Sequence, residues 1–269
     1  MGEKKIMRRI FAASDLHAGA PYSAWQRDIG RIEAGIRAAD CAVLCGDMFE
    51  GTMMHMPLKA RIALGRQVLT RLANANPDST LHVLFGNHEL PLIVGGTPDK
   101  APYLEVAQAI REAARGLPNV QLHEKGWLQL GDIVFTHGHR EIGMVEPEPN
   151  RLTQTLHLLP NIALPGYSAA TWIYPTRQTV QKLYDAFAKE KLDGPVNHIV
   201  FGHTHAPLQA YTLKGQKLGG NDVQFHNLGA AIAYRPGIFQ PLMFEQDEGG
   251  ITQSVRRPGP QADVSAGRR

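Results

Sequence analysis

Five short apolar stretches of this sequence each end in side chains that can bind a metal ion. These side chains are Asp, Asn and His, and they fall within residues 14–17, 46–47, 86–89, 137–139 and 202–205. Asp supplies an anionic oxygen that can bridge two cations, Asn supplies a neutral oxygen, and neutral His supplies a nitrogen that suits transition metals. The clusters therefore indicate metal chemistry.

Seven side chains in these clusters are candidate ligands. They are Asp15, His17, Asp47, Asn87, His137, His203 and His205. Seven ligands are too many for one ion, but they suit two ions that share Asp47, each with a position left for water or substrate. Two ions about 3.5–4 Å apart typically catalyse in-line displacement at phosphorus. The sequence thus predicts two divalent or transition-metal ions, with Mn the first expectation and Fe, Zn, Co or Ni as alternatives.

The elements that carry the clusters alternate along the chain. Short apolar runs predict buried strands at 9–13, 42–45, 81–85, 133–136 and 198–201. Amphipathic stretches between them predict helices at 25–39, 57–75, 102–115 and 176–191. This alternation is typical of an α/β layered fold. Because ligands bind beyond the carboxyl ends of parallel strands, a parallel core would bring all five clusters to one edge.

The last third of the chain has a different pattern. Apolar runs at 208–213, 223–227 and 241–244 are separated by Gly-rich turns, as in antiparallel hairpins that extend a sheet. Residues from about 141 to 175 contain many Pro and follow no regular period, which indicates a cap-like insertion. We therefore expect one domain over residues 1–255 and a disordered tail over 256–269.

Composition excludes several classes of protein. Hydrophobic residues make up 43% and charged residues 20%, which excludes wholesale disorder. The formal net charge of +3 permits contact with phosphates but gives no strong nucleic-acid signal. Two cysteines, Cys41 and Cys45, are too few for a disulfide-framed secreted fold and are expected to be buried. No transmembrane segment of roughly 18 apolar residues and no signal peptide is evident, so we expect a cytoplasmic protein.

Taken in order, the clusters resemble the motif set of the calcineurin-like metallophosphoesterase superfamily. The family pattern is Asp-x-His, Gly-Asp, Gly-Asn-His-Glu/Asp, His and Gly-His-x-His. All five blocks occur here without substitution, between about residues 9 and 230. The resemblance implies an α/β fold in which a two-sheet β-sandwich is flanked by helices, with a binuclear metal site at the sheet edge. It also implies a hydrolase that acts on phosphoric ester bonds.

The resemblance further implies a role for each motif residue. One ion would be held by Asp15, His17, Asp47 and His205, and the other by Asp47, Asn87, His137 and His203. A metal-bound hydroxide would attack phosphorus in line, and His88 would contact the phosphoryl group or protonate the leaving oxygen. Asp15 is a second catalytic candidate because it could orient His88, a point that the sequence leaves open.

Three further residues are candidates for substrate contact, each with a structural alternative. His139 follows the His137 motif and could instead hydrogen-bond a ligand from behind. Arg140 could bind a phosphate or lie exposed, and His55 could line the pocket or pack within its loop. We expect the remaining histidines and one asparagine to be structural: His82, His123, His157, His198, His226 and Asn227.

The motifs define the reaction class but leave the substrate open. Phosphomonoesters, phosphodiesters and pyrophosphates, as small molecules or nucleotides, are all compatible. One alternative is a hydrolase similar to the UDP-diacylglucosamine pyrophosphatases, although those enzymes typically carry Arg where this chain has His88. A non-catalytic protein-binding scaffold and a nuclease acting with partner proteins are less favoured, because the ligand set is complete and the net charge is modest. The oligomeric state is not indicated.

Overall fold

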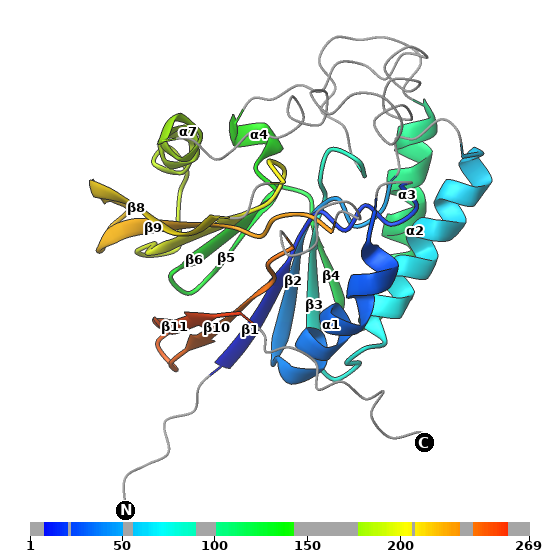
Figure 1. Cartoon of the computed structure of the whole chain (residues 1–269), viewed down its shortest axis with the longest axis horizontal. Helices are drawn as coiled ribbons and strands as arrows, with labels where there is room; N and C mark the ends of the chain where they lie inside the picture. The colour runs from blue at the N-terminus through cyan, green and yellow to red at the C-terminus, as the bar shows by residue number, and fades with distance from the viewer. Residues whose placement is uncertain are drawn as a thin grey trace, which may run out of the picture.

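The computed structural model describes residues 8–20, 23–50, 56–89, 101–142, 177–205, 208–231 and 239–257. Within these ranges, two β-sheets pack face to face, and helices cover both outer faces (Figure 1). This arrangement confirms the expected α/β fold with a two-sheet sandwich flanked by helices.

The first sheet is mixed, with the strand order β11-β10-β1-β2-β3-β4. Strands β1 to β4 run parallel, and β10 and β11 extend the sheet antiparallel beyond β1. The bounds are β1 Arg8–Ala13, β2 Cys41–Cys45, β3 Thr80–Leu84, β4 Val120–His123, β10 Leu242–Gln246 and β11 Thr252–Arg256.

The second sheet has the strand order β5-β6-β7-β9-β8. Strands β6, β7 and β9 run parallel, and β5 and β8 flank them antiparallel. The bounds are β5 Trp127–Leu130, β6 Ile133–Thr136, β7 His198–Phe201, β8 Leu208–Lys217 and β9 Asp222–Asn227.

Helices cover the outer faces because each has one apolar side. The first sheet is covered by α1 Trp25–Ala38, α2 Leu58–Ala73 and α3 Ala101–Arg115, and the second by the short α4 His139–Ile142 and by α7 Arg177–Phe187. Ile32, Leu69 and Ile110 of the first three helices share one buried cluster with Phe11 and Leu44 of the first sheet.

The interior of the sandwich is apolar. Ile10 and Val43 of the first sheet meet Phe135 and Val200 of the second in one cluster. Cys41 and Cys45 are buried in the same cluster as free thiols, as the sequence predicts.

The predicted strands that precede the five motifs all occur, with bounds within one residue of those expected. The helix expected over 176–191 ends earlier, at Phe187. Strands β4, β5 and β11 were not predicted. All three lie at sheet edges and are only partly buried, so their sequences lack a continuous apolar run.

The five motifs are divided between the two sheets and do not follow one parallel core. Three of them leave the first sheet, and two leave the second. The cap over about 141–175 and the tail over 256–269 fall almost wholly outside the described ranges, so both stay predictions. None of the described helices is long and apolar enough to cross a membrane.

Candidate metal centre

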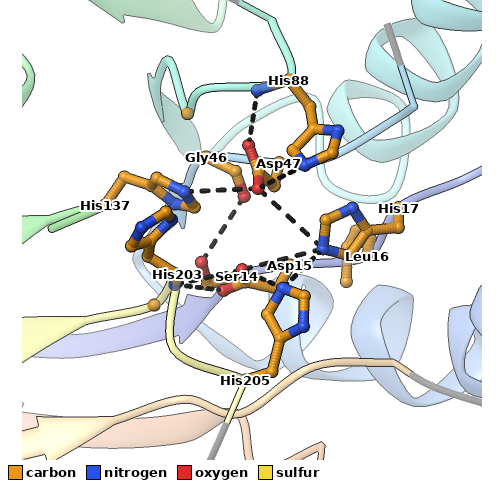
Figure 2. Close-up of polar contacts among 12 residues, drawn as sticks. Ser14, Asp15, Leu16, His17, Gly46, Asp47, His88, His137, His203 and His205 are labelled. Atoms are coloured by element: carbon orange, nitrogen blue, oxygen red, sulfur yellow. Dashed lines mark hydrogen bonds and ion pairs between the residues drawn. The ribbon is translucent and has the colours of Figure 1, made fainter. Parts of the chain in front are cut away.

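The five motifs meet where the two sheets come together. Those after β1, β2 and β3 leave the first sheet, and those after β6 and β7 leave the second. Within each sheet these strands run parallel, so their carboxyl ends lie at one edge. Figure 2 shows His137 and His203 on one side of the Asp15 and Asp47 carboxylates and His17 on the other. The fold thus assembles side chains that are far apart in the sequence.

Five candidate ligands have a left-handed backbone conformation that non-glycine residues rarely adopt. Positive φ angles between 45° and 66° occur at Asp15, His17, Asp47, His203 and His205. Only one other non-glycine residue in the described ranges, Ala210, has a positive φ. Each such conformation costs roughly 1–3 kcal/mol, and such residues are concentrated at functional sites. The ligand loops are therefore held in strained geometry by their surroundings.

Two glycines allow the ligand loops to approach one another closely. A Cβ atom at Gly86 would stand 2.1 Å from Oδ1 of Asp47, and one at Gly202 would stand 2.2 Å from Oδ2 of Asp15. Neither glycine has a positive φ. Glycine is required at these positions because the carboxylates need the space.

The first group of ligand atoms comes from Asp15, His17, Asp47 and His205, and all of them lie within 4.8 Å of one another. The Nε2 atoms of His17 and His205 are 3.0 Å apart, and Nε2 of His205 is 3.3 Å from Oδ1 of Asp15. Nε2 of His17 is 3.9 Å from Oδ2 of Asp47. Two imidazoles and two carboxylates form a donor set that suits a transition-metal ion.

The second group comes from Asp47, His137 and His203, whose ligand atoms also lie within 4.8 Å. Nε2 of His137 is 3.3 Å from Oδ2 of Asp47 and 3.0 Å from Oδ1 of Asn87. Oδ2 of Asp47 is buried and accepts no hydrogen bond from the described residues, a condition that a cation would relieve. These residues therefore fit two metal ions that share Asp47.

Hydrogen bonds to the backbone orient two of these ligands. Nδ1 of His137 donates to the carbonyl of Cys45 at 2.8 Å, which turns Nε2 toward Asp47. Both carboxylate oxygens of Asp15 lie 3.0 Å from the backbone N–H of His203, which donates to them. These hydrogen bonds fix the orientation of the His137 and Asp15 side chains.

Glu89 connects the loop after β2 with the loop after β3 through hydrogen bonds. Its buried carboxylate accepts hydrogen bonds from the N–H groups of Asp47 at 2.8 Å, Phe49 at 3.2 Å and Gly86 at 2.9 Å. Burial and the neighbouring Asp47 carboxylate raise the pKa of Glu89 to about 7. Glu89 therefore holds the loops after β2 and β3 in register.

Asn227, at the end of β9, supports the loop after β7. Its side-chain amide donates to the carbonyl of Gly202 at 3.0 Å and to the hydroxyl of Thr204 at 2.7 Å, and its oxygen accepts from the N–H of Gly229 at 2.8 Å. These bonds give Asn227 a structural role beside His203 and His205.

Charged neighbours shift the pKa values of Asp15, Asp47 and His137 away from their usual values. Burial alone would raise the pKa of Asp15, but His205 and His137 lower it below its usual value. Burial alone would also raise the pKa of Asp47, but His137 and His88 lower it well below its usual value. Burial would lower the pKa of His137, yet Asp47 and Asp15 raise it to about 9. The two carboxylates therefore favour the protonated form of His137.

Sequence comparison agrees with this geometry. The family model described as calcineurin-like phosphoesterase matches residues 8–207. The chain belongs to the calcineurin-like phosphoesterase family. In general terms it is a metal-dependent phosphoester hydrolase.

A solved structure of a metallophosphoesterase from Sphaerobacter thermophilus is similar to this phosphoesterase over 95% of this chain and 90% of its own. The identity is 15% and the TM-score is 0.41, a likeness too distant to carry any inference about substrate. No curated protein matches the chain.

One carboxylate of this phosphoesterase was missed by sequence reasoning. Oε1 of Glu50 forms a very short contact with Nδ1 of His88, and its Oε2 lies 3.5 Å from Nδ1 of His17. Burial alone would raise the pKa of Glu50, but His88 and His17 lower it. Among the described residues, the carboxylate in contact with Nδ1 of His88 is that of Glu50, whereas Asp15 accepts hydrogen bonds from the backbone N–H of His203. Glu50 follows Asp47 by three residues, but that spacing alone does not reveal the contact.

His17, Glu50 and His88 also lie close enough to be a candidate group for an ion. Because Glu50 and His88 contact each other directly, we interpret the group as a hydrogen-bond network. The backbone N–H of His88 donates to Oδ1 of Asp47 at 3.0 Å, and its Nε2 lies 3.7 Å from Oδ2 of Asp47. His88 therefore stands beside the centre with Nε2 on the side of Asp47.

The three candidate substrate residues have different surroundings. His139 is buried, and its ring centroid lies 5.2 Å from that of His137 and 6.1 Å from that of His203. Burial, followed by the charge of His137, lowers the pKa of His139 to about 2. Arg140 is exposed and donates to the carbonyl of Lys125 at 3.1 Å. His55 lies outside the described residues.

The histidines expected to be structural lie in two pairs away from the motifs. Nδ1 of His82 is 3.0 Å from Nε2 of His123, and Nδ1 of His198 is 3.1 Å from Nε2 of His226. His157 lies outside the described residues. Neither pair belongs to a group of three His, Cys, Asp or Glu whose ligand atoms lie within 4.8 Å of one another in the described ranges, so neither is a candidate metal site.

Proposed function

We propose that this chain is a binuclear metallophosphoesterase that uses water to cleave a phosphomonoester, phosphodiester or pyrophosphate bond. The observation that carries the proposal is the sharing of Asp47 by two adjacent ligand groups. One group is completed by Asp15, His17 and His205, and the other by Asn87, His137 and His203. Ions bound there would activate water and neutralise charge on the phosphoryl oxygens. Manganese is the first candidate for both positions.

The chain's own contribution to bond cleavage is a proton for the leaving oxygen. Glu50 accepts a hydrogen bond from Nδ1 of His88 and so leaves Nε2 as the nitrogen that donates toward the centre. A nearby carboxylate stabilises the protonated imidazole, which suits a general acid. We therefore assign His88 as the acid and Glu50 as the residue that positions it.

The substrate class is narrowed by what His88 can do. A proton donor is most useful when the leaving group is a strongly basic alkoxide, as in alkyl phosphomonoesters and phosphodiesters. Leaving phosphates of sugar-nucleotide pyrophosphates need less help, so a pyrophosphatase similar to the UDP-diacylglucosamine enzymes is the second candidate. A protein-binding scaffold would need neither His88 nor a complete ligand set.

The proposal is tested by metal analysis and by substrate screening on the same preparation. The metal-free protein is titrated with Mn, bound metal is measured by elemental analysis, and hydrolysis is measured on phosphomonoesters, phosphodiesters, cyclic nucleotides and sugar-nucleotide pyrophosphates. We expect about two ions per chain and Mn-dependent turnover of at least one class.

A control variant at the surface shows whether the two measurements respond to changes away from the centre. Asp40→Asn changes an exposed carboxylate that contacts only Arg9 among the described residues and should leave both readouts unchanged. Binding of a single ion even at saturation would exclude the binuclear proposal. Full occupancy without hydrolysis of any substrate class would favour the scaffold.

A further inference from the structure

His139 is a buried imidazole for which the described residues provide no hydrogen-bond partner. It is 2% exposed, and neither Nδ1 nor Nε2 has a partner in the described part of the chain. Buried polar groups are almost always hydrogen-bonded, because leaving one unpaired destabilises the folded chain. A residue with two such atoms therefore requires an explanation.

His139 does not support the ligands beside it. Nδ1 of His137 already donates to the carbonyl of Cys45, so His137 does not depend on His139 for its orientation. The backbone N–H of His203 donates to Asp15. In the described residues, His139 therefore forms no hydrogen bond to a candidate metal ligand.

His139 is also not a member of the ligand groups. The atoms of Asp47, His137 and His203 lie within 4.8 Å of one another, and His139 does not join them in the described ranges. Its ring nevertheless borders both histidines of that group, at 5.2 Å and 6.1 Å between centroids. It stands next to the second group without belonging to it.

We propose that His139 binds the substrate by donating a hydrogen bond to a phosphoryl oxygen next to the ligand group of Asp47, His137 and His203. This inference rests on the proposed function, because it requires a phosphoryl group at the centre. A neutral imidazole has one N–H donor, and phosphoryl oxygens are charged acceptors that form strong hydrogen bonds with such donors. Substrate binding would thus pair a donor for which the described residues provide no partner.

For His139→Phe we expect unchanged or higher stability together with weaker phosphate binding. Phe has an aromatic ring of similar size but no polar side-chain atom. Because both nitrogens lack partners, the metal-free variant should be at least as stable as the unmodified protein. Inorganic phosphate should bind the Mn-loaded variant about 10- to 100-fold more weakly, which corresponds to the loss of one hydrogen bond to a charged group. His139→Gln, which retains a donor, should recover part of that affinity.

The test uses isothermal titration calorimetry of inorganic phosphate with the Mn-loaded full chain and thermal unfolding of the metal-free chain. His226→Phe is the matched control, because His226 is equally buried but hydrogen-bonds His198 and the N–H of Ala210. That variant should lose stability and keep its phosphate affinity, the opposite of His139→Phe. Metal content is measured for every variant.

Three results would overturn the proposal. Unchanged phosphate affinity in His139→Phe would exclude a contact with the phosphoryl group. Loss of metal from that variant would assign His139 to the ligand set, and a clear loss of stability would indicate that its nitrogens are already satisfied in the free protein. If the unmodified protein binds neither Mn nor phosphate, it is the proposed function that fails.

Discussion

Asp47 is the side chain through which the two halves of the centre are connected. In the described ranges it alone belongs to both ligand groups, and its Oδ2 atom accepts no hydrogen bond. Its backbone is itself held by Glu89, and its Oδ1 accepts from His88. In the proposed binuclear centre, a carboxylate shared in this way would keep two cations close together and balance their charge.

We predict that Asp47→Ala loses both ions, whereas Asn87→Ala loses mainly one. Asp47 contributes to both groups, but Asn87 lies only beside His137 in the second group. Elemental analysis after Mn loading and desalting measures the difference. Equal metal loss in the two variants would contradict the assignment of Asp47 as the shared ligand.

His88 should act on the leaving group without holding a metal. His88→Ala is expected to lower turnover of alkyl phosphoesters by about a hundred- to ten-thousand-fold, with metal content nearly unchanged. The loss should be smaller for p-nitrophenyl esters, because p-nitrophenolate needs little protonation. Steady-state kinetics on both ester types provides the measurement.

Glu50→Gln is the companion variant. It removes the charge that pairs with His88 but keeps a side chain that can accept a hydrogen bond. We expect the same dependence on the leaving group, with a smaller loss than in His88→Ala. Equal losses for alkyl and p-nitrophenyl esters in both variants would point instead to a role for His88 on the phosphoryl oxygens.

At the scale of the elements, the positions of the candidate ligands depend more on the loops after the strands than on the strands themselves. The parallel strands bring the motifs to a common edge, but the ligand positions depend on contacts between loops. Glu89 joins the loops after β2 and β3 through three backbone N–H groups. Gly86 and Gly202 leave space for the carboxylates of the facing loops.

We predict that Glu89→Ala destabilises the metal-free protein by about 3 kcal/mol or more, because it leaves three buried N–H donors without an acceptor. It should also weaken metal binding, since one donor belongs to Asp47. Urea unfolding gives the free energy, and metal analysis gives the second effect. Glu112→Ala is the matched control: its exposed ion pair with Arg66 should contribute less than about 1 kcal/mol. Similar losses in the two variants would contradict the bridging role of Glu89.

At the scale of the whole molecule, two pairs of histidines make the fold sensitive to acid. Burial, together with the partner His123, lowers the pKa of His82 to about 4, and burial together with His198 lowers that of His226 to about 3. Each group binds a proton less readily in the folded chain than in the unfolded chain, where the usual pKa is near 6.5. Stability from these groups is therefore complete above pH 6.5 and is lost as the pH falls toward 4 and below.

We predict that replacing His82 and His226 by Gln together makes the unfolding free energy of the metal-free protein less dependent on pH between 6.5 and 4.5. The unfolded state of the variant no longer takes up the two extra protons in this window. Urea unfolding at several pH values measures the slope. The Asp15 and Asp47 carboxylates also respond to acid, so the comparison of slopes isolates the histidines. Parallel slopes would show that these pairs do not contribute.

The sequence by itself determined the reaction chemistry and the elements that carry it. Asp, Asn and His are side chains that bind transition-metal ions, and parallel strands end in loops at one edge of a sheet, so both leave local patterns that can be read without coordinates. The five strands that precede the motifs occur within one residue of their predicted bounds. The edge strands β4, β5 and β11 left no comparable pattern because only part of their surface is buried.

Only the tertiary structure decided which residues support the ligands. The contact between Glu50 and His88 joins residues 38 positions apart, and a Glu near a metal motif is not distinguishable by type or spacing from a surface Glu. From the sequence, His139 could either contact the substrate or hydrogen-bond a metal ligand. The structure shows that the ligand His137 is already oriented by its hydrogen bond to the carbonyl of Cys45. The division of the motifs between two sheets was equally hidden, because strand order depends on long-range packing that local periodicity does not encode.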